Sequence, residues 1–180
     1  MKKNILISSL IAIMALFLNA AFANAQSSTS FATINIEKIS KEARVVKNIA
    51  TQISKKRDSF QKQISAQEKK LEKEQKKLEA KKDILSSSAL QEEQKKFFKK
   101  VEKLKNDATK KDKILKKAYG DSIKKVNDIV GEIVNEIAKD KGLSLVLPSS
   151  QVVYSIEAID ITSQVVAKLD KRVSKIKVKF

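Results

Sequence analysis

The sequence predicts an α+β protein that is predominantly α, in which a small β body shared between subunits carries one long antiparallel helical hairpin per subunit. Residues 41–141 contain no proline and place apolar residues at steps of three, four and seven, the spacing of a helix face in a coiled coil. The chain also has only one proline, three glycines and no tryptophan, which favours long helices over a compact mixed domain.

The missing residue types exclude several kinds of chemistry. Without histidine or cysteine the chain has no Ser-His-Asp or Cys-His nucleophile, no thiol redox couple and no zinc site of the usual ligands. None of the three glycines lies in a GxxxxGK or GxGxxG loop, so a phosphate-binding loop is absent from the sequence. We therefore expect no enzyme, no catalytic residues, no cofactor and no metal.

Residues 1–25 have the pattern of a signal peptide. Two lysines precede an apolar run over residues 5–18, and Ala23-Asn24-Ala25 offers an A-x-A cleavage site. An uncleaved membrane anchor is the alternative, but the run is short for a span of about 20 residues. We expect cleavage before Gln26 and export to the periplasm.

Residues 26–40 are expected to contain a polar leader and the first strand of the body. Apolar residues alternate with small or polar ones from Phe31 to Ile36. The β-branched residues of this segment favour a strand over the start of a helix.

The hairpin is expected to span residues 41–141 with its turn near 86–88. Three consecutive serines interrupt the apolar seam there, and Ser88 with Gln91 has the spacing of a capping box. Apolar residues are dense in the seam near the body and sparse toward the turn, which predicts weak packing at the far end. About 50 residues per arm gives a length on the order of 75 Å. Gly142 is expected to end the second helix.

Residues 142–171 return to a period of two and are expected to complete the body. Segments 143–147 and 151–154 are predicted as two strands that form a β-hairpin. Asp160 or Thr162 is predicted to cap a short terminal helix.

Residues 172–180 form a basic tail in which lysine alternates with an apolar residue. We expect a frayed end; an edge strand and a contact with a membrane surface are the alternatives.

The body is too small to be stable alone. Removing the hairpin and the signal leaves roughly 50 residues, which rarely bury enough surface for an independent fold. Three short strands also leave open edges that can pair with another chain. We expect strands from several copies to combine into one sheet or barrel, whose copy number the sequence leaves open. The residues assigned to this shared body are Phe31, Ile34, Ile36, Leu145, Leu147, Val153 and Tyr154.

Five features occur in a recognisable order: the strand 31–36, the charged hairpin, the strand 143–147, the pair Val153-Tyr154, and Asp160-Ile161-Thr162 before the last helix. In this order the sequence resembles the Skp/OmpH family of periplasmic chaperones. The resemblance implies a homotrimer with a small β-barrel body and three helical tentacles. Their cavity would hold unfolded outer-membrane proteins without ATP. Lipopolysaccharide or an anionic membrane surface is a further candidate partner, and the tail is longer than the family pattern.

The hairpin carries most of the positive charge. Residues 41–120 contain 25 Lys+Arg against 12 Asp+Glu, a net charge of +13. For a chaperone, this field would steer acidic unfolded clients toward the arms. Weakly packed apolar residues near the turn would then give adaptable contacts that sum to useful avidity. The residues assigned to client binding are Leu85, Leu90, Phe97 and Phe98.

Phe97 fits the seam of the hairpin, whereas Phe98 lies about 100° round the helix. Phe98 is therefore either exposed or packed in a slightly rotated seam.

Two other functions remain as alternatives. A basic helical protein can bind nucleic acid, but the signal peptide, the scarcity of arginine and the few aromatic residues argue against a physiological nucleic-acid partner. A structural coiled-coil adaptor of the cell envelope would favour a fuller, more regular heptad seam.

Overall fold

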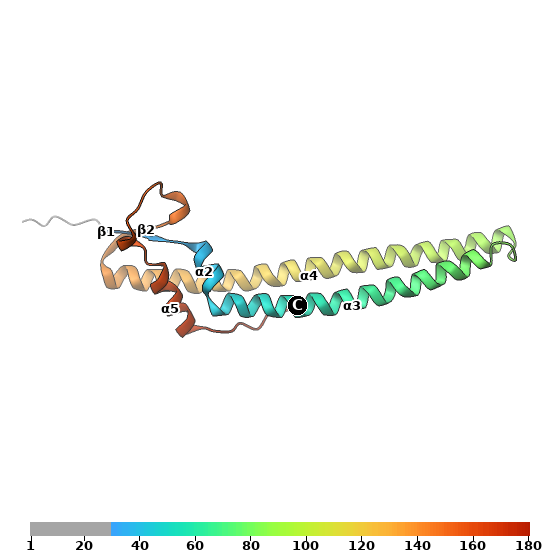
Figure 1. Ribbon diagram of the computed structural model, residues 1–180, viewed down its shortest axis with the longest axis horizontal. Helices are drawn as coiled ribbons and strands as arrows, with labels where there is room; N and C mark the ends of the chain where they lie inside the picture. The colour runs from blue at the N-terminus through green and yellow to red at the C-terminus, as the bar shows by residue number, and fades with distance from the viewer. Residues whose placement is uncertain (1–29) are drawn as a thin grey trace, which may run out of the picture. The chain divides into compact units, whose positions relative to one another are not determined.

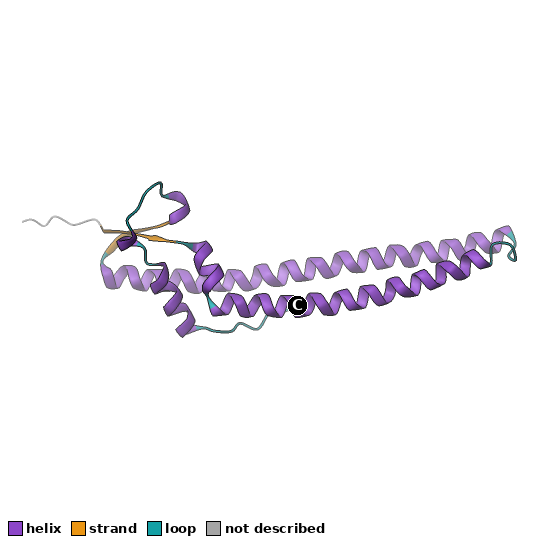
Figure 2. Cartoon of the chain, in the orientation of Figure 1, coloured by secondary structure: helices purple, strands orange, loops and turns teal. Residues whose placement is uncertain are grey.

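The computed structural model describes residues 30–180, and Phe31–Phe180 form one compact unit. The elements in chain order are β1 (Ser30–Ile34), α2 (Ile36–Glu42), α3 (Arg44–Ala80), α4 (Ser87–Lys141), β2 (Leu143–Pro148) and α5 (Thr162–Arg172), with 3₁₀ turns at Ser149–Gln151 and Glu157–Ile159 (Figure 1). Helix dominates the described part of the chain, as predicted (Figure 2). The predicted signal peptide at residues 1–25 lies outside the described residues.

Helices α3 and α4 form the predicted long hairpin and lie side by side (Figure 1). The 55 residues of α4 correspond to about 80 Å of helix. The antiparallel register is visible in two contacts across the pair: Lys100 Nζ lies 2.7 Å from Glu74 Oε2, and Lys111 Nζ donates to Gln63 Oε1 over 2.9 Å. The hairpin begins at Arg44, not at residue 41, because Ala43 has an extended backbone (φ −60°, ψ 129°) that separates α2 from α3.

The apolar seam is graded along the hairpin, which confirms the sequence prediction. The buried residues of α3 all lie between Val45 and Ile53, and those of α4 all lie between Leu115 and Ile137. We call these two segments the root of the hairpin. From residue 54 to residue 114 the two helices contain no fully buried side chain. This part, the arm, therefore gains little from packing, since most helix stability in proteins comes from burying one face.

The turn of the hairpin spans residues 81–86, so it begins a few residues before the predicted position near 86–88 and includes the first serine. Helix α3 ends at Ala80, and the loop closes with a hydrogen bond from Leu85 N–H to the Lys81 carbonyl (3.0 Å). Ser86 is the N-cap of α4, and its hydroxyl accepts a hydrogen bond from Ala89 N–H (3.4 Å). Ser88 therefore lies inside the helix. Three adjacent serines can all cap, and the chain direction after the loop selects the first.

The end of α4 follows the prediction. Gly142 adopts the left-handed conformation (φ 62°, ψ 34°), and its N–H donates to the carbonyls of Ala138 and Lys139. A residue with a Cβ is strained in this conformation, so glycine permits the sharp reversal into β2.

The strands differ from the prediction in extent and in pairing. β1 ends at Ile34, because Asn35 caps α2 by accepting from Lys38 N–H (2.8 Å), and Ile36 is already helical. β2 pairs with β1 in a two-stranded sheet. The predicted hairpin between 143–147 and 151–154 is wrong. After Pro148 the chain forms a 3₁₀ turn in which Val152 N–H donates to the Ser149 carbonyl (3.2 Å), and residues 152–154 form no strand.

Helix α5 packs against the root. The fully buried residues Val165 and Leu169 of α5 belong to one core cluster with Ile49 of α3 and Ile133 of α4. The N-cap of α5 is Ile161, not Asp160 or Thr162 as predicted, although Asp160 Oδ1 accepts from Thr162 N–H (2.7 Å) at the first residue of the helix. The Thr162 hydroxyl oxygen in turn accepts from Asn35 N–H (2.8 Å), which ties the start of α5 to the end of β1.

The tail after α5 packs on α3, so the predicted frayed end is wrong. Val178 is 5% exposed and belongs to the core cluster, against which Ile176 also packs. The segment returns beside α3 instead of extending from the unit (Figure 1).

Candidate functional site

The arm exposes large apolar side chains around its turn. Ile84 is 81% exposed and Phe98 is 65% exposed, whereas Leu85, Leu90 and Phe97 are half-buried. The rings of Phe97 and Phe98 meet edge to face with centroids 6.1 Å apart. Phe97 lies in the seam and Phe98 lies outside it, which decides between the two positions considered for Phe98.

Ile84 is the apolar residue that sequence reasoning missed. It adjoins Leu85 just before the serines, and two consecutive apolar residues cannot both face a helical seam. That adjacency was the available signal. A single exposed apolar residue is common on protein surfaces, so Ile84 bears on function only together with the exposed Phe98 of the same arm.

A shallow groove of about 410 Å³ lies between α3 and α4 near the turn. Its apolar lining comes from Leu78 and Phe97. Five lysines and two glutamates surround these residues, namely Lys77, Lys81, Lys96, Lys99, Lys100, Glu74 and Glu93. The groove is open and combines an apolar floor with an excess of positive charge, so it can hold an irregular chain loosely but cannot define a rigid pocket.

The ion pairs along the arm leave its charge largely uncompensated. Glu93 accepts a hydrogen bond from Lys96, and this bond with the nearby ammonium charge holds the pKa of Glu93 below its ordinary value. Lys76 pairs with Glu72 one turn away in the same manner. Such exposed pairs contribute little stability. Because lysines outnumber acids about two to one here, the arm keeps a positive field whatever the pairing.

Phe60 marks the place where the arm meets the root. Two ammonium groups lie near its ring, with Lys111 Nζ 4.4 Å and Lys56 Nζ 4.9 Å from the ring centroid. Lys111 belongs to α4, so this cation–π contact joins the two helices where apolar burial has ended.

The body exposes a second set of apolar residues. Val153 is fully exposed and Tyr154 is 80% exposed, in the segment that follows the 3₁₀ turn. Ile156, Phe31, Leu145 and Ile36 are between 45% and 54% exposed. Among the other predicted body residues, Ile34 is buried in the core and Leu147 is half-buried. Ile34 and Ile36 together line a groove with Val146 and Pro148 of β2 and several residues of α4.

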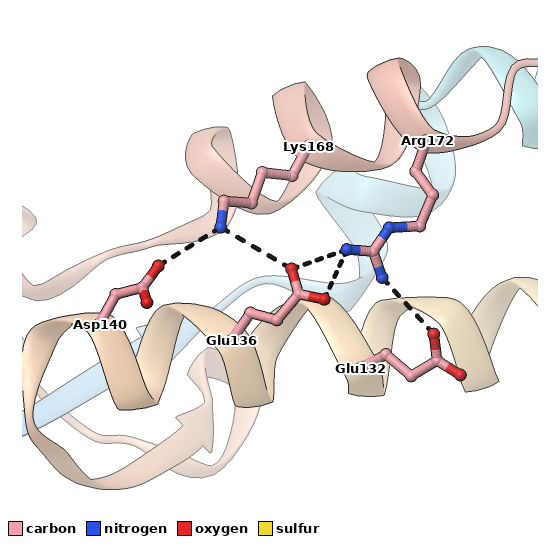
Figure 3. A network of polar contacts seen from close by, with 5 residues as sticks. All are labelled: Glu132, Glu136, Asp140, Lys168 and Arg172. Atoms are coloured by element: carbon pink, nitrogen blue, oxygen red, sulfur yellow. Dashed lines mark hydrogen bonds and ion pairs between the residues drawn. The ribbon is translucent and has the colours of Figure 1, made fainter.

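A network of charged residues fixes α5 on α4 (Figure 3). Both terminal nitrogens of Arg172 reach α4: one lies 2.6 Å from the Glu136 carboxylate and the other 3.5 Å from Glu132. Lys168 lies 3.8 Å from Glu136 and 3.6 Å from Asp140. The hydrogen bond from Arg172 holds the pKa of Glu136 below its ordinary value.

On its other side α5 is bonded to the start of α3. Asp170 accepts from Arg44 N–H (2.8 Å) and from Arg44 Nε (2.9 Å). Burial acts to raise the pKa of Asp170, but these bonds and the guanidinium charge together lower it. The contacts to α3 and α4 set the direction in which the tail leaves α5.

Within residues 30–180 no group of acidic side chains is placed to hold a metal ion. Over the same residues no helix has both the length and the apolarity needed to cross a bilayer.

Comparison with known proteins identifies the family. A search of curated proteins found no significant match. A solved structure from Caulobacter crescentus, described as an outer membrane chaperone (OmpH-like), has a similar fold. It superimposes with a TM-score of 0.77 at 18% identity, and the match covers 83% of this chain and 89% of that one. At this identity the likeness shows the fold alone. The family model "Outer membrane protein (OmpH-like)" matches residues 30–169, and the chain therefore belongs to the OmpH-like family.

Proposed function

We propose that this protein is an ATP-independent holdase chaperone that binds unfolded outer-membrane proteins between its basic helical arms during their transit through the periplasm. The observation that carries the proposal is the combination of exposed apolar side chains, chiefly Ile84 and Phe98, with the uncompensated positive charge of the arm. Membership of the OmpH-like family and the chaperone description of the Caulobacter neighbour support the same function.

The arm suits weak capture better than rigid recognition. Its half-buried residues, such as Leu78 and Phe97, line an open groove rather than a closed pocket. Single contacts of this kind are weak and exchange rapidly. Several arms acting on one chain multiply them, so that a client is retained without a defined binding conformation and without nucleotide.

The function requires several arms held around one space. In the described part of the chain no strand pairs with the outer edge of β2, which is therefore open to pairing with another chain. The outer edge of β1 is partly covered by Asp160 and Ile161, whose N–H donates to the Thr33 carbonyl (3.0 Å). Val153, Tyr154 and Leu145 add exposed apolar surface in the same body. We propose that copies of the chain share these surfaces in a homotrimer with a β-barrel body, the copy number following the family resemblance.

The test is suppression of aggregation. The purified mature protein, without nucleotide, is mixed with a urea-unfolded outer-membrane β-barrel protein that is diluted into buffer, and turbidity is followed. We expect the client to remain soluble at an equimolar amount of trimer. Unchanged aggregation at low salt would refute the proposal. Replacing Ile84 and Phe98 by serine should reduce protection, whereas serine at the exposed, uncharged arm positions Gln61 and Gln91 should not.

A further inference from the structure

The tail is held on α3 by a side chain that recognises main-chain atoms. Gln52 Nε2 donates to the Ile176 carbonyl (2.8 Å), and Gln52 Oε1 accepts from Val178 N–H (3.1 Å). In a parallel sheet, one residue of a neighbouring strand makes the same two bonds, to the carbonyl and the N–H on either side of a residue, here Lys177. The Gln52 side-chain amide therefore takes the place of a strand's main-chain amide. The second hydrogen of the Gln52 amide goes to Asn48 Oδ1 (2.8 Å), which fixes the orientation of the amide.

The side chains of the tail alternate as those of a strand do. Val178 is buried and Ile176 is half-buried, whereas Lys175, Lys177 and Lys179 are exposed. The Phe180 ring lies 5.2 Å from Lys56 Nζ, four residues beyond Gln52 on the same face of α3. The surface of Asn48, Gln52 and Lys56, which we call the α3 site, therefore accepts an extended segment with apolar residues at every second position.

The lysines of the tail contribute nothing attractive to this contact. Within residues 30–180 none of the three has an ion-pair partner at the α3 site or elsewhere. Helix α3 is itself rich in lysine, and like charges repel, so the three tail lysines oppose docking. The bound tail is thus held by main-chain hydrogen bonds, apolar packing and the contact of the Phe180 ring with Lys56, and it is opposed by repulsion between lysines.

We propose that the α3 site binds extended segments of unfolded clients in which apolar residues alternate, and that residues 175–180 occupy it as a displaceable internal ligand. The inference rests on the proposed function, since it names the part of the client that is recognised. Strands of outer-membrane barrels alternate apolar and polar residues with a period of two, as the tail does. A client strand presents mixed polar residues where the tail presents lysines, so it binds the α3 site without the repulsion and displaces the tail.

The test follows the tail in the full chain. The chain has no cysteine, so spin labels can be attached at S59C and K179C alone. The labelled protein is diluted with unlabelled protein, so that only distances within one chain are measured. We expect one narrow distance distribution in the free protein. An unfolded outer-membrane protein should convert it to a broad, longer one. Raising the salt concentration should favour the docked tail, because screening removes the repulsion.

The role of Gln52 is tested with a matched pair of variants. Gln52→Met removes both main-chain hydrogen bonds but keeps the length of the side chain, and it should shift the equilibrium roughly tenfold toward the released tail. Gln63→Met on the same helix removes only an exposed bond to Lys111 and should leave the tail docked. Equal tail release in the two variants would overturn the proposal.

A peptide probe tests the site without a client protein. A synthetic peptide with the sequence of residues 173–180, but threonine for each lysine, should release the tail from the full chain. A second peptide of the same sequence is N-methylated at the valine that corresponds to Val178, so it lacks the N–H that donates to Gln52 Oε1. Releasing the tail should then take an about tenfold higher peptide concentration. Equal potency of the two peptides would count against recognition of the main chain.

The two proposals fail differently. If the protein suppresses client aggregation while the tail distance stays unchanged, the α3 site is not a client site and the holdase function stands. If the peptide releases the tail but aggregation is unaffected, the α3 site stands and the holdase function fails.

Discussion

Deleting the same side chain at the root and on the arm should have unequal effects on stability. Leu169 of α5 is fully buried against the root, whereas Leu104 of α4 is half-buried on the arm. Leu169→Ala removes buried methyl groups and leaves a cavity that tightly packed neighbours cannot fill, which costs about 2–5 kcal/mol. Leu104→Ala loses only partial burial and leaves no closed cavity, so we expect about 1 kcal/mol or less.

Urea unfolding followed by circular dichroism at 222 nm gives both free energies of unfolding, since the chain has no tryptophan for a fluorescence probe. Both variants are measured at the same protein concentration as the wild type, because the proposed trimer would make stability depend on concentration. Hydrogen exchange measures stability locally. Amides of the arm should exchange by local opening, whereas the opening free energy of root amides should approach the global free energy of unfolding. Equal destabilisation by the two substitutions would refute the graded hairpin, as would equal protection of arm and root.

Four further predictions follow from the described contacts. Tyr154→Asp places a charge on the exposed body surface, and light scattering at micromolar concentration should then give the mass of a monomer; an unchanged oligomer would remove this surface from the interface. Raising the salt concentration from about 50 to 500 mM should slow client capture in stopped-flow experiments if charge steers the encounter, and salt-insensitive capture would point to apolar contacts alone. Gly142→Ala should lower the melting temperature, because alanine is strained at φ 62°, whereas Gly120→Ala within α4 should raise it slightly. The pKa values of Glu136 and Asp170 are lowered, so both carboxylates add stability above their ordinary pKa values of 4.5 and 3.8, and this stability is lost as the pH falls through the lowered values. Arg172→Gln and Arg44→Gln should therefore each weaken the dependence of the free energy of unfolding on pH in the acid range. An unchanged dependence would contradict the role of these two ion pairs.

Features that depend on neighbouring residues were predictable. The spacing of apolar residues predicted two long helices, and their thinning toward residue 86 predicted the graded seam that burial confirms. Gly142 predicted the end of α4 because few other residues tolerate the left-handed conformation at a helix end. Asp160 located the start of α5 only to within a residue, since its Oδ1 accepts from Thr162 N–H while the N-cap itself is Ile161.

Choices among equivalent local signals were not predictable. Three consecutive serines offered the same capping chemistry, and the loop closed by Lys81 and Leu85 decided that Ser86 caps α4. Segment 151–154 has the composition of a strand, but β2 takes its partner from the start of the chain instead. Only one of the adjacent residues Ile84 and Leu85 can face the apolar seam, and the sequence does not say which. The folded loop places Ile84 in solvent.

The sequence alone thus determined a basic helical hairpin with a tight root and a loose arm, because helical periodicity and charge are properties of adjacent residues. The tertiary structure decided what the tail does. Its alternating pattern was compatible with a frayed end, an edge strand or a membrane contact, since nothing within eight residues distinguishes these. The deciding partner, Gln52, lies 126 residues from Val178 in the sequence, and a hydrogen bond over that separation exists only once α5 has packed on the root.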